Sequence, residues 1–282
     1  MFRGVSFVTG DKTARIVAMK ACEALNNSGY DAEMCAPAEA VCKVRDDMLY
    51  LADDAETVKR LADASAKVCG FMHGTNKQER FPGLKYVFDD VDEVDSDSYR
   101  KAWERLAGCP WTIAKTDRLL IRETTIDDLE ALYDIYSDPR ITRYQDGLYE
   151  DREAETQYMK DYIEKIYGLM GFGIWSLVRL EDNTLIGRAG LSAANGFDNI
   201  ELGFTVGIPW QRQGYAYEAC SQILRFAEWV LGVTRVYASV KHGNTASAGL
   251  CVKLGFERGE ETHDGYIRYL WRADNGQIHN GS

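Results

Sequence analysis

The sequence predicts an α/β protein of two domains: a small parallel-sheet domain over residues 1–112 and a mixed-sheet α+β domain over residues 116–272. Three observations support this prediction. A chain of 282 residues is long enough for two domains that each bury a core. Short apolar strands alternate with helices in the first part, which is typical of a parallel sheet covered by helices. In the second part, alternating strands lead into a long amphipathic helix.

The first domain opens with a short apolar strand, Gly4 to Thr9, followed by a helix over residues 11–27. The order of its elements suggests a Rossmann-like half-domain. Further strands are predicted at 48–52, 67–72 and 86–88, and further helices at 55–66 and 98–106. In the first helix we expect four apolar residues to face inward: Ile16, Met19, Ala24 and Leu25.

An acidic pair follows the second predicted strand, in the segment Leu49 to Asp54. This segment resembles the later part of a haloacid-dehalogenase-like core, in which such a pair at the carboxyl end of a strand holds magnesium. That family attacks phosphate with the first carboxylate of an Asp-x-Asp pair, and the matching place here reads Thr9 to Thr13. Because the paired carboxylates are missing, we interpret Asp53 and Asp54 as an N-cap and a solvated acid. We therefore expect a noncatalytic accessory domain.

The composition excludes several classes of function. Acidic residues outnumber basic ones by 44 to 33, and neither half of the chain is basic, which argues against nucleic-acid binding. The acidic balance suits a cationic acceptor such as an amine, and it also serves solubility alone. No apolar run approaches the roughly 20 residues of a membrane span. The seven cysteines form no CxxC pair, so neither a metal site nor a disulfide framework is implied, and a reducing cytoplasm fits.

The boundary between the domains is expected near Gly108 to Trp111. Asp117 to Arg122 then alternates as an edge strand, and Thr125-x-x-Asp128 has the pattern of a capping box that opens a helix. A second helix is predicted at about 151–167. Further strands are predicted at 171–180, 185–191, 235–240 and 266–272, and residues 273–282 are expected to form a tail.

The stretch from Asn199 to Trp229 organises the second domain. It begins with alternating apolar residues, the period of a half-buried strand, and Pro209 ends that strand by removing a hydrogen-bond donor. An amphipathic helix follows. In the loop between them, Gly214 lets the backbone approach a ligand closely. The free amides of the first helical turn form a site at which a pyrophosphate would be held.

The pattern Gln211-x-x-Gly214-x-Ala216, between a strand and an amphipathic helix, resembles the acyl-CoA pyrophosphate loop of the GNAT superfamily of N-acyltransferases. A second strand, an Asn244-x-x-Ser247 helix and a terminal Gly-Phe follow in the superfamily's order. The strand and helix that open the domain resemble the N-terminal arm of its ribosomal-protein N-terminal acetyltransferase-like branch, the RimJ/RimL type. The C-terminal half is therefore identified as a GNAT domain.

This resemblance implies the activity. It implies direct transfer of an acetyl group from acetyl-CoA, as cosubstrate, to a primary amine on a protein N-terminus or a small molecule, without a metal. A different class of function fits the same features: a CoA-binding regulatory or interaction module without turnover. The two differ in whether an amine triggers release of the CoA thiol.

The resemblance also implies a cofactor site. Phe204, Thr205 and Val206 would offer free backbone groups to the pantetheine arm, and the loop amides would bind the pyrophosphate. Arg212 either adds charge near phosphate or is a solvated loop arginine. Asn244 either bonds the pantetheine or caps its own helix. The remaining implied cofactor residues are Gln211, Gln213, Gly214, Tyr215, Ala216 and Ser247.

Two residues are candidates for proton transfer. Glu201 sits at the head of the central strand, where the family often carries a general base, and a salt-bridged surface glutamate is the alternative. Cys251 occupies the position of the tyrosine that acts as general acid in many members. Its thiol, with a reference pKa of about 8.5, could protonate the departing thiolate, and inert packing of a buried cysteine is the alternative.

Overall fold

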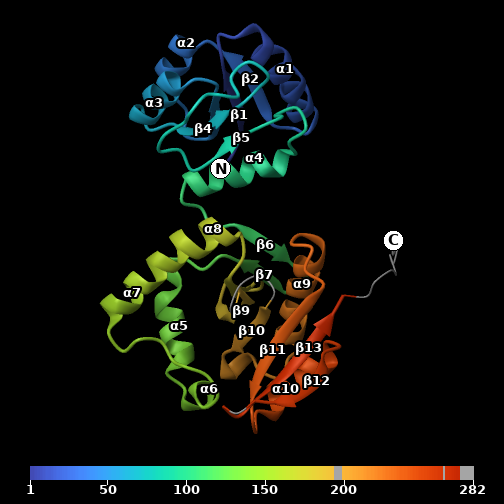
Figure 1. Ribbon diagram of the computed structural model, residues 1–282. Helices are drawn as coiled ribbons and strands as arrows, with labels where there is room; N and C mark the ends of the chain where they lie inside the picture. Colours follow the sequence, from blue (N-terminus) through green and yellow to red (C-terminus); the bar gives the residue numbers. More distant parts are fainter. Residues whose placement is uncertain (194–198, 263, 274–282) are drawn as a thin grey trace. The chain divides into compact units, whose positions relative to one another are not determined.

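The computed structural model describes residues 1–193, 199–262 and 264–273. The chain divides into two compact units, Met1–Trp111 and Thr112–Ser282, which are described separately (Figure 1). No helix within the described ranges is both long and apolar enough to cross a membrane.

The N-terminal unit is a five-stranded parallel sheet in the order β2-β1-β3-β4-β5. Helices cover both faces, since one buried cluster includes residues of α1 and α4 and another includes residues of α2 and α3. This arrangement confirms the predicted parallel α/β fold. The strands are β1 (Gly4–Val8), β2 (Asp31–Cys35), β3 (Met48–Ala52), β4 (Lys67–Phe71) and β5 (Val87–Phe88). The helices are α1 (Lys12–Asn27), α2 (Pro37–Cys42), α3 (Ala55–Asp63) and α4 (Ser96–Leu106).

Two elements of this unit were not predicted, β2 and α2. Both are short, and β2 is a partly exposed edge strand in which charged residues replace the apolar run of an inner strand. Neither element therefore carries a strong periodic signal.

Of the four residues predicted to face inward from α1, Leu25 is buried as predicted and the other three are not. Ile16 is 62% exposed and Met19 is 57% exposed, and Ala24 is exposed as well. The buried face instead carries small side chains with Leu25 at its end, which allow the helix to lie close against the sheet. The prediction relied on the size of the apolar side chains, and the larger ones, Ile16 and Met19, lie on the exposed side of the helix. The buried residues are Ala14, Ala18, Ala21 and Leu25.

The C-terminal unit is an eight-stranded mixed sheet in the order β12-β13-β11-β10-β9-β8-β7-β6, as the predicted fold class requires. Its strands are β6 (Thr112–Lys115), β7 (Leu119–Arg122), β8 (Ile174–Arg179), β9 (Leu185–Ala193), β10 (Ile200–Val206), β11 (Arg235–Lys241), β12 (Glu257–Glu261) and β13 (Tyr266–Arg272). Its helices are η1 (Ile126–Asp128), α5 (Leu129–Tyr136), α6 (Pro139–Thr142), α7 (Arg152–Asp161), the π-helical η2 (Tyr162–Tyr167), α8 (Gly168–Met170), η3 (Ile208–Trp210), α9 (Tyr215–Trp229) and α10 (Thr245–Lys253).

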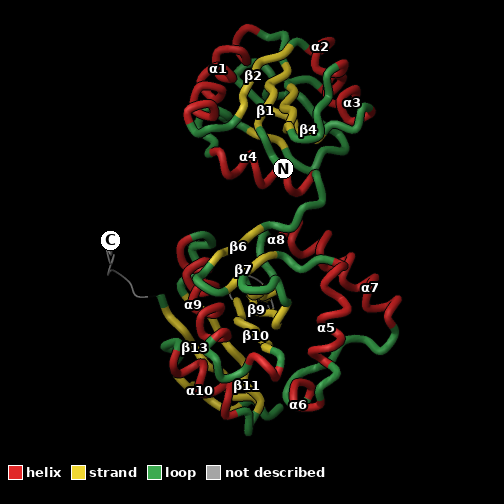
Figure 2. The backbone as a smooth tube through the Cα atoms, turned by 180° about the vertical axis from the view of Figure 1, so that it is seen from behind, coloured by secondary structure: helices red, strands yellow, loops and turns green. Residues whose placement is uncertain are grey.

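Helices lie on both sides of the central strands. Seen from the front and from behind, α5 and α7 lie on one side, and α9 and α10 lie on the other (Figures 1 and 2). The apolar residues of β10 pack with α9 in the main core of this unit. On the opposite face, Tyr136 of α5 contacts Thr205 of β10. Helices therefore pack against both faces of the central strands.

Two details of this sheet differ from the prediction. The strand predicted at Asp117 to Arg122 does not lie at the edge, because β6 pairs outside β7. The strand β12 was not predicted, since all of its residues are exposed and lack an apolar pattern. Of the predicted tail, residues 274–282 lie outside the described residues.

Candidate functional site

The two central parallel strands separate soon after they meet. β10 pairs with β9 along its whole length, but it pairs with β11 at a single position, Glu201 with Tyr237. Beyond that position the backbone of β10 has no strand partner on the β11 side. Gly207 donates its amide to β9, so alternation directs the main-chain groups of Phe204 and Val206 toward the gap. This opening creates a site for a ligand that needs main-chain partners.

The loop after β10 presents free amides at the start of α9. Arg212 and Gly214 both have left-handed backbones, with φ of 61° and 85°. Left-handed residues in such a turn orient successive amides toward one concave side, which favours an anion. Within the described part of the chain, the amides of residues 212–216 have no hydrogen-bond acceptor. Together with the positive end of α9 they form an anion site.

The two glutamines of the loop stabilise its shape. The Gln211 side chain donates to the carbonyl of Val206 at 2.8 Å, and the Gln213 side chain donates to the carbonyl of Pro209 at 2.8 Å. Both bonds tie the loop to the end of the preceding strand. Their side chains are therefore occupied by structural hydrogen bonds.

Arg118 supports the same loop from outside, a role that no pattern in the sequence indicates. Its Nη1 donates to the carbonyl of Gln213 at 3.0 Å, and its Nε donates to the Glu218 carboxylate at 2.7 Å. The guanidinium also lies over the Tyr215 ring, 4.4 Å from its centroid. By holding a carbonyl on the outer side, Arg118 keeps the opposing amides turned toward the gap.

A cleft of about 700 Å³ lies along this loop and strand edge. That volume is within the range of small-molecule sites. Every cofactor residue implied by the sequence lines the cleft except Gln213. One wall was missed by the sequence: it consists of α6 and the loop after it, including Tyr144 and Gln145. Tyr144 donates to the Gly243 carbonyl at 3.2 Å and so connects this wall to the loop before α10.

Asn244 caps its own helix. Its Oδ1 accepts the Ser247 amide at 3.1 Å, and both residues line the cleft. Of the two alternatives for Asn244, the structure shows the helix cap, and the side-chain nitrogen of Asn244 remains available to a ligand.

The two proton-transfer candidates lie outside the cleft lining. Glu201 is half-buried where β10 and β11 separate, on the same face as Thr205, and its Oε1 accepts the Ser239 amide at 2.8 Å. Cys251 is 0% exposed and packs in the core that also contains Cys220. Burial raises the pKa of the Cys251 thiol to about 12. The structure therefore does not bring Cys251 to the reacting groups.

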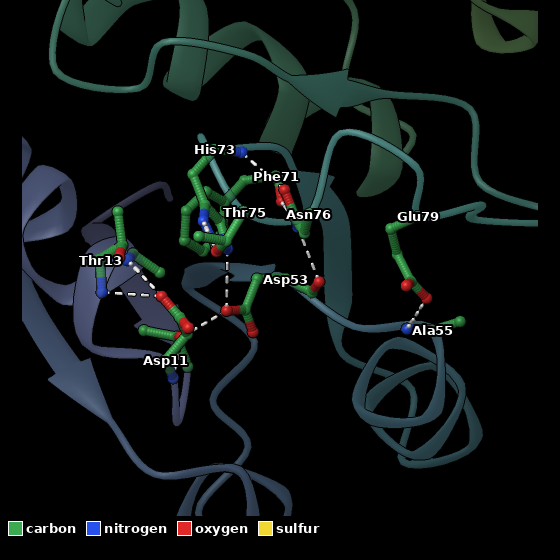
Figure 3. A network of polar contacts seen from close by, with 11 residues as sticks. Asp11, Thr13, Asp53, Ala55, Phe71, His73, Thr75, Asn76 and Glu79 are labelled. Atoms are coloured by element: carbon green, nitrogen blue, oxygen red, sulfur yellow. Dashed lines mark hydrogen bonds and ion pairs between the residues drawn. The ribbon is translucent and has the colours of Figure 1, made fainter.

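The acidic pair of the N-terminal unit also departs from its interpretation. Asp54 is the N-cap of α3, accepting the Thr57 amide at 2.8 Å, but Asp53 is 8% exposed and not solvated. Its carboxylate accepts the Thr9 hydroxyl. It also lies 3.2 Å from Nε2 of His73 (Figure 3). Burial raises the pKa of Asp53, and the hydrogen bonds from Thr9 and His73 oppose that effect without outweighing it. Among the described residues, no group of three or more His, Cys, Asp or Glu side chains is placed to hold a metal ion.

A mixed sheet whose parallel strands separate beside an anion-binding helix start defines an acyltransferase-type fold. The chain belongs to the GNAT acetyltransferase family, since the family model for an acetyltransferase (GNAT) domain matches residues 118–257. It is 32% identical over 149 residues to the uncharacterized N-acetyltransferase YoaA of Bacillus subtilis, covering 52% of this chain and 83% of that protein. The predicted family membership is confirmed.

Two further comparisons agree with this result. The ribosomal protein uS5-alanine N-acetyltransferase of Escherichia coli is 26% identical over 152 residues, covering 51% of this chain and 77% of that protein. The crystal structure of an acetyltransferase from Agrobacterium tumefaciens superposes with a TM-score of 0.50 at 21% identity. That match covers 57% of this chain and 94% of the other, and it shows likeness of fold.

Proposed function

We propose that the protein transfers an acetyl group from acetyl-CoA to a primary amine, which attacks the thioester carbonyl directly. The observation that carries this proposal is the pairing of an opened strand edge with unpaired amides at the start of α9. A pyrophosphate and a pantetheine arm need these two kinds of partner side by side.

The residues present fit acetyl-CoA. The amides of residues 212–216 would bind the pyrophosphate, and the exposed Arg212 would add positive charge beside it. The main-chain groups of Phe204 and the amide of Val206 would bond the pantetheine arm, and Asn244 also lines this cleft. A main-chain amide of the same strand edge would stabilise the oxyanion that forms on the thioester carbonyl.

The amine must lose a proton before it attacks, because an ammonium ion has no lone pair. Glu201 keeps one carboxylate oxygen free of the Ser239 amide, and we assign it as the base, acting through water. The departing thiolate must gain a proton. Cys251 is buried too deeply to donate this proton. We therefore assign the role of general acid to Ser247, whose hydroxyl lies in the cleft wall and would relay a proton from solvent.

The test is release of the CoA thiol from acetyl-CoA in the presence of an amine panel. Amine-dependent release supports the transferase. Binding of acetyl-CoA without such release would favour the alternative, a regulatory or interaction module. Family membership favours turnover, because the matched relatives are N-acetyltransferases by name.

We propose further that the N-terminal unit is a noncatalytic accessory domain. Thr9 follows its first strand where a nucleophilic carboxylate would be needed, and the Asp53 carboxylate already bonds Thr9 and His73. Phosphoester hydrolysis is therefore not expected. Turnover of p-nitrophenyl phosphate by the full chain, with and without magnesium, tests this, and any activity that is lost in Asp53→Asn would contradict it.

A further inference from the structure

Four side chains form a hydrogen-bonded relay that ends in the cleft wall. Arg188 of β9 lies directly opposite Thr205 of β10, and its Nη2 donates to Oη of Tyr136 at 2.9 Å. Tyr136 Oη donates to Thr205 Oγ1 at 3.4 Å, and Thr205 Oγ1 donates to Oε1 of Gln145 at 2.8 Å. Thr205 and Gln145 line the cleft, so the relay connects the buried Arg188, on the same face of the sheet as Thr205, to the ligand space.

The arginine sets the direction of every bond in this relay. A guanidinium can only donate, so the Tyr136 oxygen accepts from Arg188 and turns its own proton toward Thr205. Thr205 in turn donates to the carboxamide oxygen of Gln145. The carboxamide nitrogen of Gln145 is thereby left with two N–H donors and has no acceptor among the described residues. The relay thus presents a donor, rather than an acceptor, at the cleft.

The relay also begins with a buried cation. Nε of Arg188 is buried and has no hydrogen-bond partner among the described residues. Burial opposes the charge of Arg188, but Tyr136 and the nearby carboxylate of Glu155, which accepts the Tyr149 amide, outweigh burial and raise the pKa of Arg188. The guanidinium therefore stays charged and contributes a positive potential at this end of the relay, which the Glu155 carboxylate partly offsets. That potential favours an oxygen-bearing ligand and repels a second ammonium group.

We propose that this relay selects acceptors that carry a carbonyl or carboxylate oxygen beside the amine. The inference rests on the proposed function and narrows it to α-amino acyl acceptors, as opposed to polyamines. Gln145 binds the acceptor oxygen, and Arg188 is a positioning residue that acts through Tyr136 and Thr205. A polyamine offers no oxygen to Gln145 and brings an additional positive charge toward Arg188.

The first experiment compares acceptors with the full-length protein and acetyl-CoA. The acceptors are a pool of X-Gly dipeptide amides, a pool of free amino acids, putrescine and spermidine. We expect kcat/KM for at least one α-amino acyl pool to exceed that for either polyamine by at least about tenfold. Preference for the dipeptide amides assigns the oxygen to a peptide carbonyl, and preference for the free amino acids assigns it to a carboxylate. Either result supports the proposal.

Two variants test the relay itself. Gln145→Glu replaces the donor by an anion, and we expect it to reduce the preference for α-amino acyl acceptors over spermidine at least about tenfold. Tyr136→Phe keeps the ring but disconnects Arg188, and it should raise the acceptor KM about threefold to tenfold. Neither variant should change the KM for acetyl-CoA. Tyr158→Phe is the matched control, because this exposed tyrosine is outside the relay.

Three outcomes would overturn the inference. Turnover that favours polyamines would contradict it while leaving the transferase intact. An unchanged acceptor preference in Gln145→Glu, with normal folding by circular dichroism, would also contradict it. Absence of turnover with every amine would remove the proposed function and the inference together.

Discussion

The carboxylate of Glu201 accepts the backbone amide of Ser239 at 2.8 Å, beside the single position at which β10 and β11 pair. In a continuous parallel ladder such an amide donates to the neighbouring strand. Here the Glu201 side chain replaces the backbone carbonyl of the neighbouring strand as the acceptor. Glu201 therefore satisfies the Ser239 amide while the two strands separate, and this contact helps to keep the cleft open.

Substitution of Glu201 separates this structural contact from proton transfer. Glu201→Gln retains an oxygen for the Ser239 amide but removes the base, so we expect kcat to fall about a hundredfold with unchanged acetyl-CoA affinity. Glu201→Ala removes both the base and the acceptor for the Ser239 amide, so it should weaken acetyl-CoA binding as well. Steady-state kinetics and calorimetric titration provide the two readouts. A Glu201→Gln variant with kcat within twofold of wild type would exclude the base.

Gly214 is the position where a side chain would harm cofactor binding most. Its φ is 85°, and a Cβ there would lie 3.4 Å from Nη2 of Arg118. Gly214→Val should distort the loop and weaken acetyl-CoA binding by at least about tenfold, measured by calorimetry. Gly232→Val is the control, because Gly232 has a φ of 65° and open space around it. Equal affinity in both variants would count against the loop as the pyrophosphate site.

Cys251 should be dispensable for chemistry. Its thiol is buried, and burial raises its pKa to about 12. Cys251→Ala removes one buried sulfur, so we expect a loss of about 1 kcal/mol in the free energy of unfolding. Turnover per folded molecule should stay within about twofold. A large loss of kcat in a variant with a normal melting curve would return Cys251 to the mechanism.

Asp128 makes the stability of the C-terminal unit depend on pH. Burial favours its protonated form, but bonds from Arg122 at 2.7 Å and from the Thr125 amide at 2.8 Å outweigh that effect. The pKa of Asp128 is therefore held below its ordinary value. Its contribution is fully present above the unfolded-state pKa of about 3.9, and it is lost as pH falls through the lower folded pKa.

Asp128→Asn tests this dependence. We expect it to lower the free energy of unfolding by about 3 kcal/mol at pH 7, because Arg122 is left without its counter-charge. The difference from wild type should shrink below about pH 4. Urea unfolding at both pH values measures it. Asp161→Asn, which removes an exposed pair with Lys165, should change little at either pH, and a pH-independent loss in Asp128→Asn would refute the assignment.

Local patterns in the sequence were sufficient to predict most helices and strands and to locate the loop proposed to bind the cofactor. Met48–Ala52 was predicted at its observed bounds, because a continuous apolar run is a property of neighbouring residues. The terminal Gly-Phe of the family pattern places a glycine where a helix commonly ends in a left-handed residue, and the φ of Gly255 is 86°. The capping-box pattern likewise places the Asp128 carboxylate on the Thr125 amide.

The tertiary structure decided what depends on contacts between distant residues. Arg118 meets Gln213 and Arg188 meets Tyr136 only because the sheet brings their strands and helices together. The depth of Cys251 and the buried face of α1 also follow from packing, which periodicity does not specify when several faces are apolar. The sequence by itself thus determined the family and the main-chain elements of the cleft, whose signals are local. Only the fold determined which side chains support the cleft and which face the acceptor, because those depend on three-dimensional neighbours.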